Sequence, residues 1–193
     1  CDELFILKDE NLFCAIDGAP IGPDYNPGHA HADNFTYELL YRDFRVISDT
    51  GVYTYDPGAR RTYDRSTKAH NTLLINGINQ SEMWSSFRVA RRTNPDKTKI
   101  GIHDGLKFFS GELIDQVQSG KNIRHHRLIA LNGSKKCRWI LIWDTVTGRD
   151  TLDVASYCHF DPEISISKQQ EKYYIERMGQ QVGIFFPITA GSS

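Results

Sequence analysis

The stretch RHHRLIALNGSKKCRWILIWDTV, residues 124–146, decides the fold class of this chain. It holds two short apolar runs, Arg124–Leu131 and Arg138–Val146, with the turn signal Asn132-Gly133 between them. The runs contain β-branched and aromatic residues and lack a sustained 3.6-residue period, which favours strands over helices. The stretch therefore predicts two short strands separated by a turn.

The same pattern continues outward over the whole chain. Short β-rich or alternating runs are broken by Asp, Asn, Gly and Pro, and no window shows a helical apolar period with caps at both ends. The further runs are Leu4–Leu7, Leu12–Ile16, Phe35–Tyr41, Phe44–Ile47, Thr72–Ile75, Phe87–Ala90, Lys107–Leu113, Leu152–His159, Ile164–Ser167, Tyr173–Glu176 and Val182–Phe186. We predict an all-β fold, a large antiparallel β-sandwich of stacked sheets. In that fold we expect Trp139 and Trp143 in the core and Trp84 at the surface.

Length and composition exclude several classes of protein. The chain has 193 residues, of which 39% are hydrophobic and 24% charged, so it can bury a core. The net charge of −1 argues against duplex nucleic acid as the main partner. No apolar run approaches the roughly 20 residues of a membrane span. The sequence begins at Cys1 without an initiator Met and ends at Gly191–Ser193, which we interpret as a piece of a longer protein.

The four cysteines do not form a metal or redox motif. Cys1, Cys14, Cys137 and Cys158 are widely separated and include no CxxC pair, which argues against a zinc ribbon. Their disulfide state is left open. Basic clusters around Arg88, Arg124 and Lys135 suit solvated strand edges better than a polyanion surface, because the chain as a whole is slightly acidic.

A pair of histidines carries the first chemical signal. In Gly28–Asp33 (GHAHAD), His29 and His31 are two residues apart and would project to one side of an extended segment. Two imidazoles suit a divalent cation such as zinc, which takes about four ligands. Asp49 and His70, each beside an apolar run, are candidates for further ligands. A surface pair or hydrogen-bonded histidines remain the alternative.

Tyrosines and arginines crowd the segment that follows. Tyr53, Tyr55 and Tyr63 lie near Arg60 and Arg61. Removing a proton beside a carboxylate, as in elimination from a uronic acid, needs a proton carrier and groups that stabilise the developing charge. Tyrosines packed on sheet faces with their hydroxyls at the rim are the alternative.

Three segments carry a resemblance to a known family. They are GHAHADNFTYELLY (28–41), VISDTGVYTYD (46–56) and YDRSTKAHNTLLINGINQSE (63–82), and IRHHRLIAL, WILIWDTVTG and CHFDP continue it. In order and spacing the chain resembles the heparinase II/III-like domain. That resemblance implies the C-terminal β-sandwich of a polysaccharide lyase whose N-terminal part is a helical toroid. It also implies β-elimination on uronic-acid-containing polysaccharides, in a bacterial periplasmic or secreted setting.

Site residues follow from the resemblance position by position. His31, Asp49 and His70 match metal ligands, with zinc the expected metal, although manganese or iron would fit. The metal of the family is mainly structural. His29 matches a catalytic histidine facing the substrate near its carboxylate, while the substrate-facing tyrosine is left open among Tyr53, Tyr55 and Tyr63.

The resemblance also implies partners. The helical toroid is absent from this sequence, so we expect the chain to form one wall of a cleft, to bind an acidic polysaccharide and to have little activity alone. Two alternatives remain: a carbohydrate-binding or scaffold β-sandwich without catalysis, and a uronate epimerase domain, which abstracts the same proton and returns it to the opposite face.

Overall fold

The computed structural model of the protein describes residues 4–23 and 25–188. The expectations for Cys1 and for the end at Gly191–Ser193 lie outside these residues. The chain divides into two compact units, Cys1–His159 and Phe160–Ser193. Strands make up 47% of the structure and helices 7%, which confirms the predicted all-β fold. No helix among the described residues is long and apolar enough to cross a membrane.

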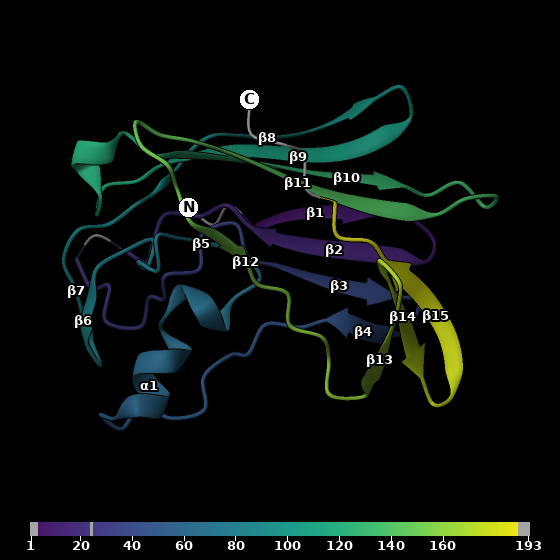
Figure 1. The fold of residues 1–193 in the computed structure, drawn as a ribbon, viewed down its shortest axis with the longest axis horizontal. Coiled ribbons are helices and arrows are strands. Elements are labelled where there is room, and N and C mark those ends of the chain that lie inside the picture. Colours follow the sequence, from purple (N-terminus) through teal and green to yellow (C-terminus); the bar gives the residue numbers. More distant parts are fainter. Residues whose placement is uncertain (1–3, 24, 189–193) are drawn as a thin grey trace. The chain divides into compact units, whose positions relative to one another are not determined.

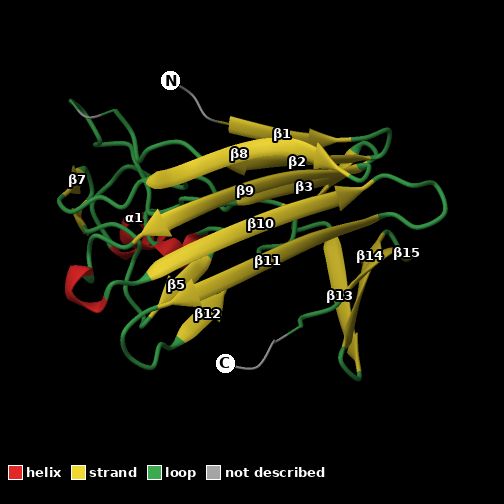
Figure 2. Ribbon diagram, turned by 90° about the horizontal axis from the view of Figure 1, so that it is seen from above, coloured by secondary structure: helices red, strands yellow, loops and turns green. Residues whose placement is uncertain are grey.

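Two antiparallel four-stranded sheets form the body of the first unit, and they are stacked in Figures 1 and 2. One has the order β1-β2-β3-β4, with β1 Leu4–Lys8, β2 Leu12–Asp17, β3 Tyr37–Tyr41 and β4 Phe44–Ile47. The other has the order β11-β10-β9-β8, with β8 Pro95–His103, β9 Leu106–Ile114, β10 Arg124–Asn132 and β11 Trp139–Thr147. The predicted sandwich of stacked sheets is therefore confirmed.

Smaller elements gather at one end of these sheets (Figure 2). They are the strand pair β5 (Leu73–Ile75) with β12 (Val154–Ser156), the hairpin β6 (Met83–Ser85) with β7 (Arg88–Val89), the helix α1 (Ala59–Asp64) and the short 3-10 turns η1 (Thr67–Ala69) and η2 (Ser119–Lys121). The second unit is an antiparallel sheet of its own, β13 (Ile164–Gln169), β14 (Lys172–Arg177) and β15 (Gln180–Phe185).

Aromatic side chains join the two large sheets. The ring of Phe109 on β9 lies 5.0 Å from that of Phe5 on β1 and 5.6 Å from that of Phe35, centroid to centroid. A Cβ at Gly111 would lie 2.5 Å from Phe35, so only glycine fits beneath that ring. Around them Leu7, Ile16 and other alternate residues of the strands are fully buried and form the core.

The expected core position of Trp143 is wrong. Its side chain is 40% exposed, and Trp139 is only half-buried. The reason is that β11 is the edge strand of its sheet and has no fully buried residue. An apolar run of this kind is ambiguous, because an edge strand can carry the same residue types as a central one. Trp84 is exposed, as predicted.

A buried ion pair connects β10 and β11. Arg127 donates two hydrogen bonds to the Asp144 carboxylate, at 2.7 and 2.8 Å. His125 Nε2 donates to the same carboxylate at 2.7 Å. His125 and Arg127 are almost fully buried. Burial alone would raise the pKa of Asp144, but the charge and hydrogen bonds of Arg127 hold it well below its ordinary value.

His125 should make stability depend on pH. Burial lowers the pKa of His125 below its ordinary value of about 6.5, although Asp144 acts in the opposite direction. The unfolded chain therefore binds the proton first as the pH falls, and the folded state loses stability below about pH 6.5. We expect His125→Gln to remove this contribution of His125 to the pH dependence of the unfolding free energy. Chemical denaturation at pH 7.5 and pH 5 should show a smaller difference in unfolding free energy for the variant than for the parent; equal differences would contradict the prediction.

Candidate metal centre

Three segments from separate parts of the sequence meet at one end of the sandwich. His31 and Asp33 lie in the loop between β2 and β3, Asp49 follows β4, and His70 follows η1. One ligand atom each from His31, Asp33 and His70 lies within 4.8 Å of the others. His31 is 8% exposed and His70 is 1% exposed, so the cluster is shielded from solvent. Paired imidazoles and carboxylates in such a place suit a divalent cation.

His70 has an acceptor at each ring nitrogen. Its Nδ1 lies 2.7 Å from Asp49 Oδ2, and its Nε2 lies 3.1 Å from the carbonyl oxygen of Asp64. Burial alone would lower the pKa of His70, but the Asp49 hydrogen bond and the charge of Asp33 raise it above its ordinary value. Burial likewise raises the pKa of Asp49, and the bond from His70 outweighs it, so that this pKa is lowered. Asp49 thus contacts the cluster through His70.

The pKa of His31 is shifted in the opposite direction. Its pKa is lowered to about 4, first by burial and then by the positive charges of His70 and Arg61. The Arg61 guanidinium lies with Nη1 3.2 Å from His31 Nε2. His31 is therefore neutral at neutral pH, and the neutral imidazole is the form that binds a metal.

Asp33 is a member of the cluster that the sequence analysis did not name as a ligand. It lies two residues after His31, the same spacing that separates His29 from His31. Burial raises the pKa of Asp33, while the charge of His70 lowers it. Burial disfavours the ionised form of this carboxyl group, and a bound cation would stabilise that form. The donor set of two imidazoles and the Asp33 carboxylate, with the Asp49 carboxylate on the Nδ1 of His70, therefore fits zinc, and it also fits manganese or iron.

Asn71 fixes the loops that carry these side chains. Its Nδ2 donates to the carbonyl oxygens of Tyr37 and Ser48, at 2.8 and 3.2 Å. Its Oδ1 accepts the backbone N–H of His159 at 2.6 Å. Arg127 Nη1 donates to the carbonyl oxygens of Phe35 and Asn71, both at 2.7 Å. The position of His70 is thus set by side chains that are themselves buried.

His29 lies at the surface, beside aromatic rings. Its ring centroid is 5.4 Å from that of Tyr55 and 6.2 Å from that of Phe87, both in edge-on contact. No hydrogen bond to the ring of His29 comes from the residues that the structure describes. The imidazole is oriented by packing alone, and its nitrogens are available to a ligand.

His29 and the cluster share one recess of about 360 Å³, which we call the polar hollow. It is lined among others by Asp17, His29, His31, Asp33, Asp49 and Val52. His29 and His31 therefore do face the same space, one exposed and the other buried. The pKa of Asp17 is raised to about 6 by burial and by the neighbouring charge of Asp33. The hollow combines a shielded cluster of potential cation ligands with an accessible imidazole. Titratable side chains with shifted pKa values that converge on one recess are typical of functional sites.

The three candidate tyrosines have different surroundings. Tyr55 contacts His29, and the Arg61 guanidinium lies 5.0 Å from its ring centroid. All three tyrosines are exposed, but Tyr53 and Tyr63 contact Arg60 instead, with its guanidinium 5.0 and 5.6 Å from their ring centroids. The structure therefore brings Tyr55, among the three, against His29.

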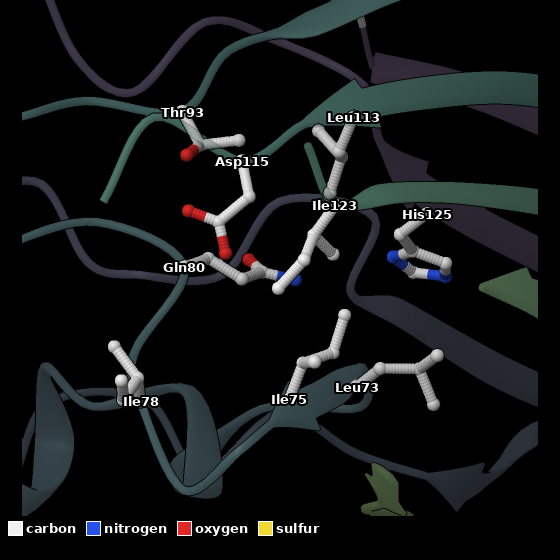
Figure 3. Close-up of a pocket in the computed structure, with 9 residues that line it drawn as sticks. All are labelled: Leu73, Ile75, Ile78, Gln80, Thr93, Leu113, Asp115, Ile123 and His125. Atoms are coloured by element: carbon white, nitrogen blue, oxygen red, sulfur yellow. The ribbon is translucent and has the colours of Figure 1, made fainter. Parts of the chain in front are cut away.

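A second cavity lies apart from this chemistry, and Figure 3 shows its lining. Its volume is about 20 Å³, and its walls are mostly apolar, with Leu73, Ile75 and Ile123 among them. His125 Nδ1 and Gln80 Oε1 have no hydrogen-bond partner among the described residues. The space suits a single buried water molecule that serves these two atoms. We assign it no catalytic role.

The fold and the site together define a β-sandwich with a cluster of two histidines and an aspartate beside an open polar recess. The sequence matches the family described as heparinase II/III-like, C-terminal, over residues 3–191. The chain therefore belongs to the heparinase II/III-like family, as the resemblance predicted. A comparison with curated proteins gave no match.

Solved structures agree with this fold. The heparan sulfate lyase HepC from Pedobacter heparinus is similar with a TM-score of 0.62 and 20% identity, over 86% of this chain and 24% of that one. Heparinase III, the BT4657 gene product, is similar with a TM-score of 0.62 and 19% identity, over 89% of this chain and 24% of that one. At this identity the likeness concerns the fold. The chain spans about a quarter of the length of these proteins.

Proposed function

We propose that this chain is the C-terminal domain of a polysaccharide lyase that cleaves uronic-acid-containing polysaccharides by β-elimination. The observation that carries the proposal is the polar hollow, in which an accessible His29 lies beside a shielded cluster of cation ligands. Family membership and the names of the similar structures support it. A helical N-terminal domain of the whole protein would supply the opposite wall of the cleft, in a periplasmic or secreted bacterial protein.

In this reaction the domain would act on the acidic proton beside the uronate carboxylate. Elimination removes the proton at C5, forms the C4–C5 double bond and releases the oxygen at C4. His29 is placed to contact the carboxylate or to move a proton there, since its nitrogens have no partner among the described residues. Tyr55 orients the imidazole by edge-on contact. Tyr55 would belong to the wall that faces the sugar, with the buried Arg61 guanidinium against its ring.

The metal is proposed to be structural. His31, Asp49 and His70 would hold it, and Asp33 would complete a set of four donors. A closed set of four protein ligands is typical of structural zinc, whereas catalytic zinc keeps a position open. Bound there, the cation would neutralise the carboxylates and fix the loop that carries His29. Orientation of a reactive side chain by a neighbouring ligand is a known use of such sites.

Product analysis tests the reaction. The full-length protein should convert uronate oligosaccharides to products with an unsaturated, ultraviolet-absorbing end. Epimerisation would give inverted uronates without new absorbance, and a pure binding domain would leave the oligosaccharide unchanged. The isolated chain, which lacks the opposite wall, should bind metal but show little turnover; full turnover by it would contradict the assignment of the catalytic wall.

We expect His29→Ala to lower the turnover of the full-length protein by about 10²-fold, because a positioned proton carrier contributes on that order. Tyr55→Phe should retain most activity, and Tyr55→Ala should lose about tenfold because the imidazole is no longer oriented. Tyr53→Ala is the matched control, since Tyr53 contacts Arg60 and not His29. Equal losses for Tyr53→Ala and Tyr55→Ala would argue against a specific role of Tyr55.

A further inference from the structure

The hairpin of β6 and β7, with its turn Ser86-Phe87, presents an unusual set of side chains beside the polar hollow. Trp84 is 62% exposed and Phe87 is 45% exposed. Arg88 is exposed, and its guanidinium carbon lies 5.9 Å from the centroid of the Trp84 ring. No carboxylate among the described residues pairs with Arg88. We call this hairpin the Trp84 hairpin.

Two buried arginines hold the backbone of the Trp84 hairpin. Arg61 Nε donates to the carbonyl oxygen of Ser86 at 3.3 Å. Arg65 Nη1 donates to the carbonyl oxygens of Ser85 and Arg88. Both arginines are almost fully buried, and the Nη2 atom of each has no hydrogen-bond partner among the described residues. The backbone of this short surface hairpin is therefore anchored to two buried guanidinium groups.

The Trp84 hairpin is continuous with the wall that carries His29. Phe87 at its turn is in edge-on contact with His29, and it stacks on Tyr55 with ring centroids 6.3 Å apart. Arg61, which holds the hairpin, also contacts His31. The aromatic surface therefore runs from His29 and Tyr55 to Phe87 at the turn of the Trp84 hairpin.

We infer that Trp84 and Arg88 form a further subsite for the acidic polysaccharide, on the Trp84 hairpin and one or more sugar units away from His29. This inference rests on the proposed function and adds to it a place where the substrate is held. The flat face of an indole packs against the C–H face of a sugar ring, and it stays amphipathic enough to face water when empty. An unpaired guanidinium binds a carboxylate or a sulfate group through two parallel hydrogen bonds. A hairpin whose backbone is hydrogen-bonded to two buried arginines has less conformational freedom to lose on binding.

Length-dependent binding tests the inference. The full-length protein with His29→Ala, which slows turnover during the titration, is titrated calorimetrically with acidic oligosaccharides of increasing length. We expect Trp84→Ala and Arg88→Gln to weaken binding of long oligosaccharides about tenfold each and to leave the shortest ones unchanged. Trp143→Ala is the matched control, because Trp143 is also exposed but lies on β11. Trp84→Phe, which preserves an aromatic face, should recover part of the affinity.

Sulfated and unsulfated oligosaccharides identify the anionic group. If Arg88→Gln lowers the affinity for the sulfated oligosaccharides alone, Arg88 binds a sulfate group. If it lowers the affinity for both series, Arg88 binds the carboxylate. Either result supports the subsite. Unchanged affinity in both variants, or equal loss at every length, would overturn it. The lyase function and the subsite can fail separately. Length-dependent binding without an unsaturated product would contradict only the lyase function. Formation of unsaturated product without length-dependent binding would contradict only the subsite.

Discussion

Replacing His31, Asp49 or His70 by alanine is expected to abolish metal binding, whereas His29→Ala should keep it at one ion per chain. The physical reason is geometric. His31 and His70 are buried together, and Asp49 contacts the Nδ1 of His70 at 2.7 Å. Removing one of about four ligands commonly leaves too few donors for tight binding. Elemental analysis of the purified chain after exhaustive dialysis measures the metal directly.

A second readout follows from linkage between metal binding and folding. An ion that binds only the folded chain stabilises it by about 2.7 kcal/mol when its free concentration is a hundred times the dissociation constant. A chelator should therefore lower the melting temperature of the wild type and of His29→Ala, and it should not affect the ligand variants. Metal that persists in His70→Ala, or that disappears with His29→Ala, would be incompatible with the proposed ligands.

Asp33 is distinguished from Asp49 in the same series. If both carboxylates bind the ion, Asp33→Asn and Asp49→Asn should each lower the amount of zinc that the chain retains after dialysis. If Asp49 only orients His70, then Asp49→Asn should weaken metal binding less than Asp33→Asn does. The reason is that a residue that contacts a ligand, and not the ion itself, affects the metal only indirectly. The comparison therefore separates a four-ligand site from a three-ligand site with a supporting carboxylate.

Asp144→Ala is expected to destabilise the fold by about 3 kcal/mol, since it leaves the buried charge of Arg127 without its partner. Arg127 would keep only its bonds to the carbonyl oxygens of Phe35 and Asn71. His125 would also lose its hydrogen bond. Urea denaturation measures the change, as a lower midpoint with an unchanged slope.

Lys97→Ala provides the control for that prediction. Lys97 forms an ion pair with Glu112 at 2.7 Å, but its side chain is exposed, and exposed pairs contribute little. The two variants therefore separate the effect of burial from the effect of ion pairing. A loss in Asp144→Ala no larger than that in Lys97→Ala would show that the Arg127 network has little energetic weight.

The sequence pattern predicted most of the strands because apolar side chains recur where sheets are packed. The strand Phe44–Ile47 has the predicted bounds, and most others differ by one to three residues at an end. Strand β8 was missed because Pro95–His103 begins with Pro and Asp, is interrupted by two Lys and a Gly, and has no fully buried residue. Helix α1 was missed because its six residues are too few for a helical period, and its buried positions are Arg61 and Asp64.

The site was predictable only in part. The spacing of His29 and His31, and the family pattern at Asp49 and His70, place these residues near one another, as the structure does. Arg127 had no such signal, and the sequence indicated Arg61 only as an arginine near the tyrosines, without a sign that it is buried. A buried arginine is compensated by carbonyl oxygens that lie far away in the sequence, such as that of Phe35, 92 residues from Arg127. Pattern and composition do not report contacts of that range. The predicted ligand roles themselves stay predictions until the metal is measured.

The bonds from Arg127 also limit how this domain can be re-engineered. The loops that carry His31 and His70 are held through Phe35 and Asn71 by a guanidinium on β10, which is itself held by a carboxylate on β11. Grafting residues 28–71 onto another β-sandwich would move the ligands and leave their anchor behind. A transplant that includes β10 and β11 should retain the loop geometry, so the smallest exchangeable module spans both sheets.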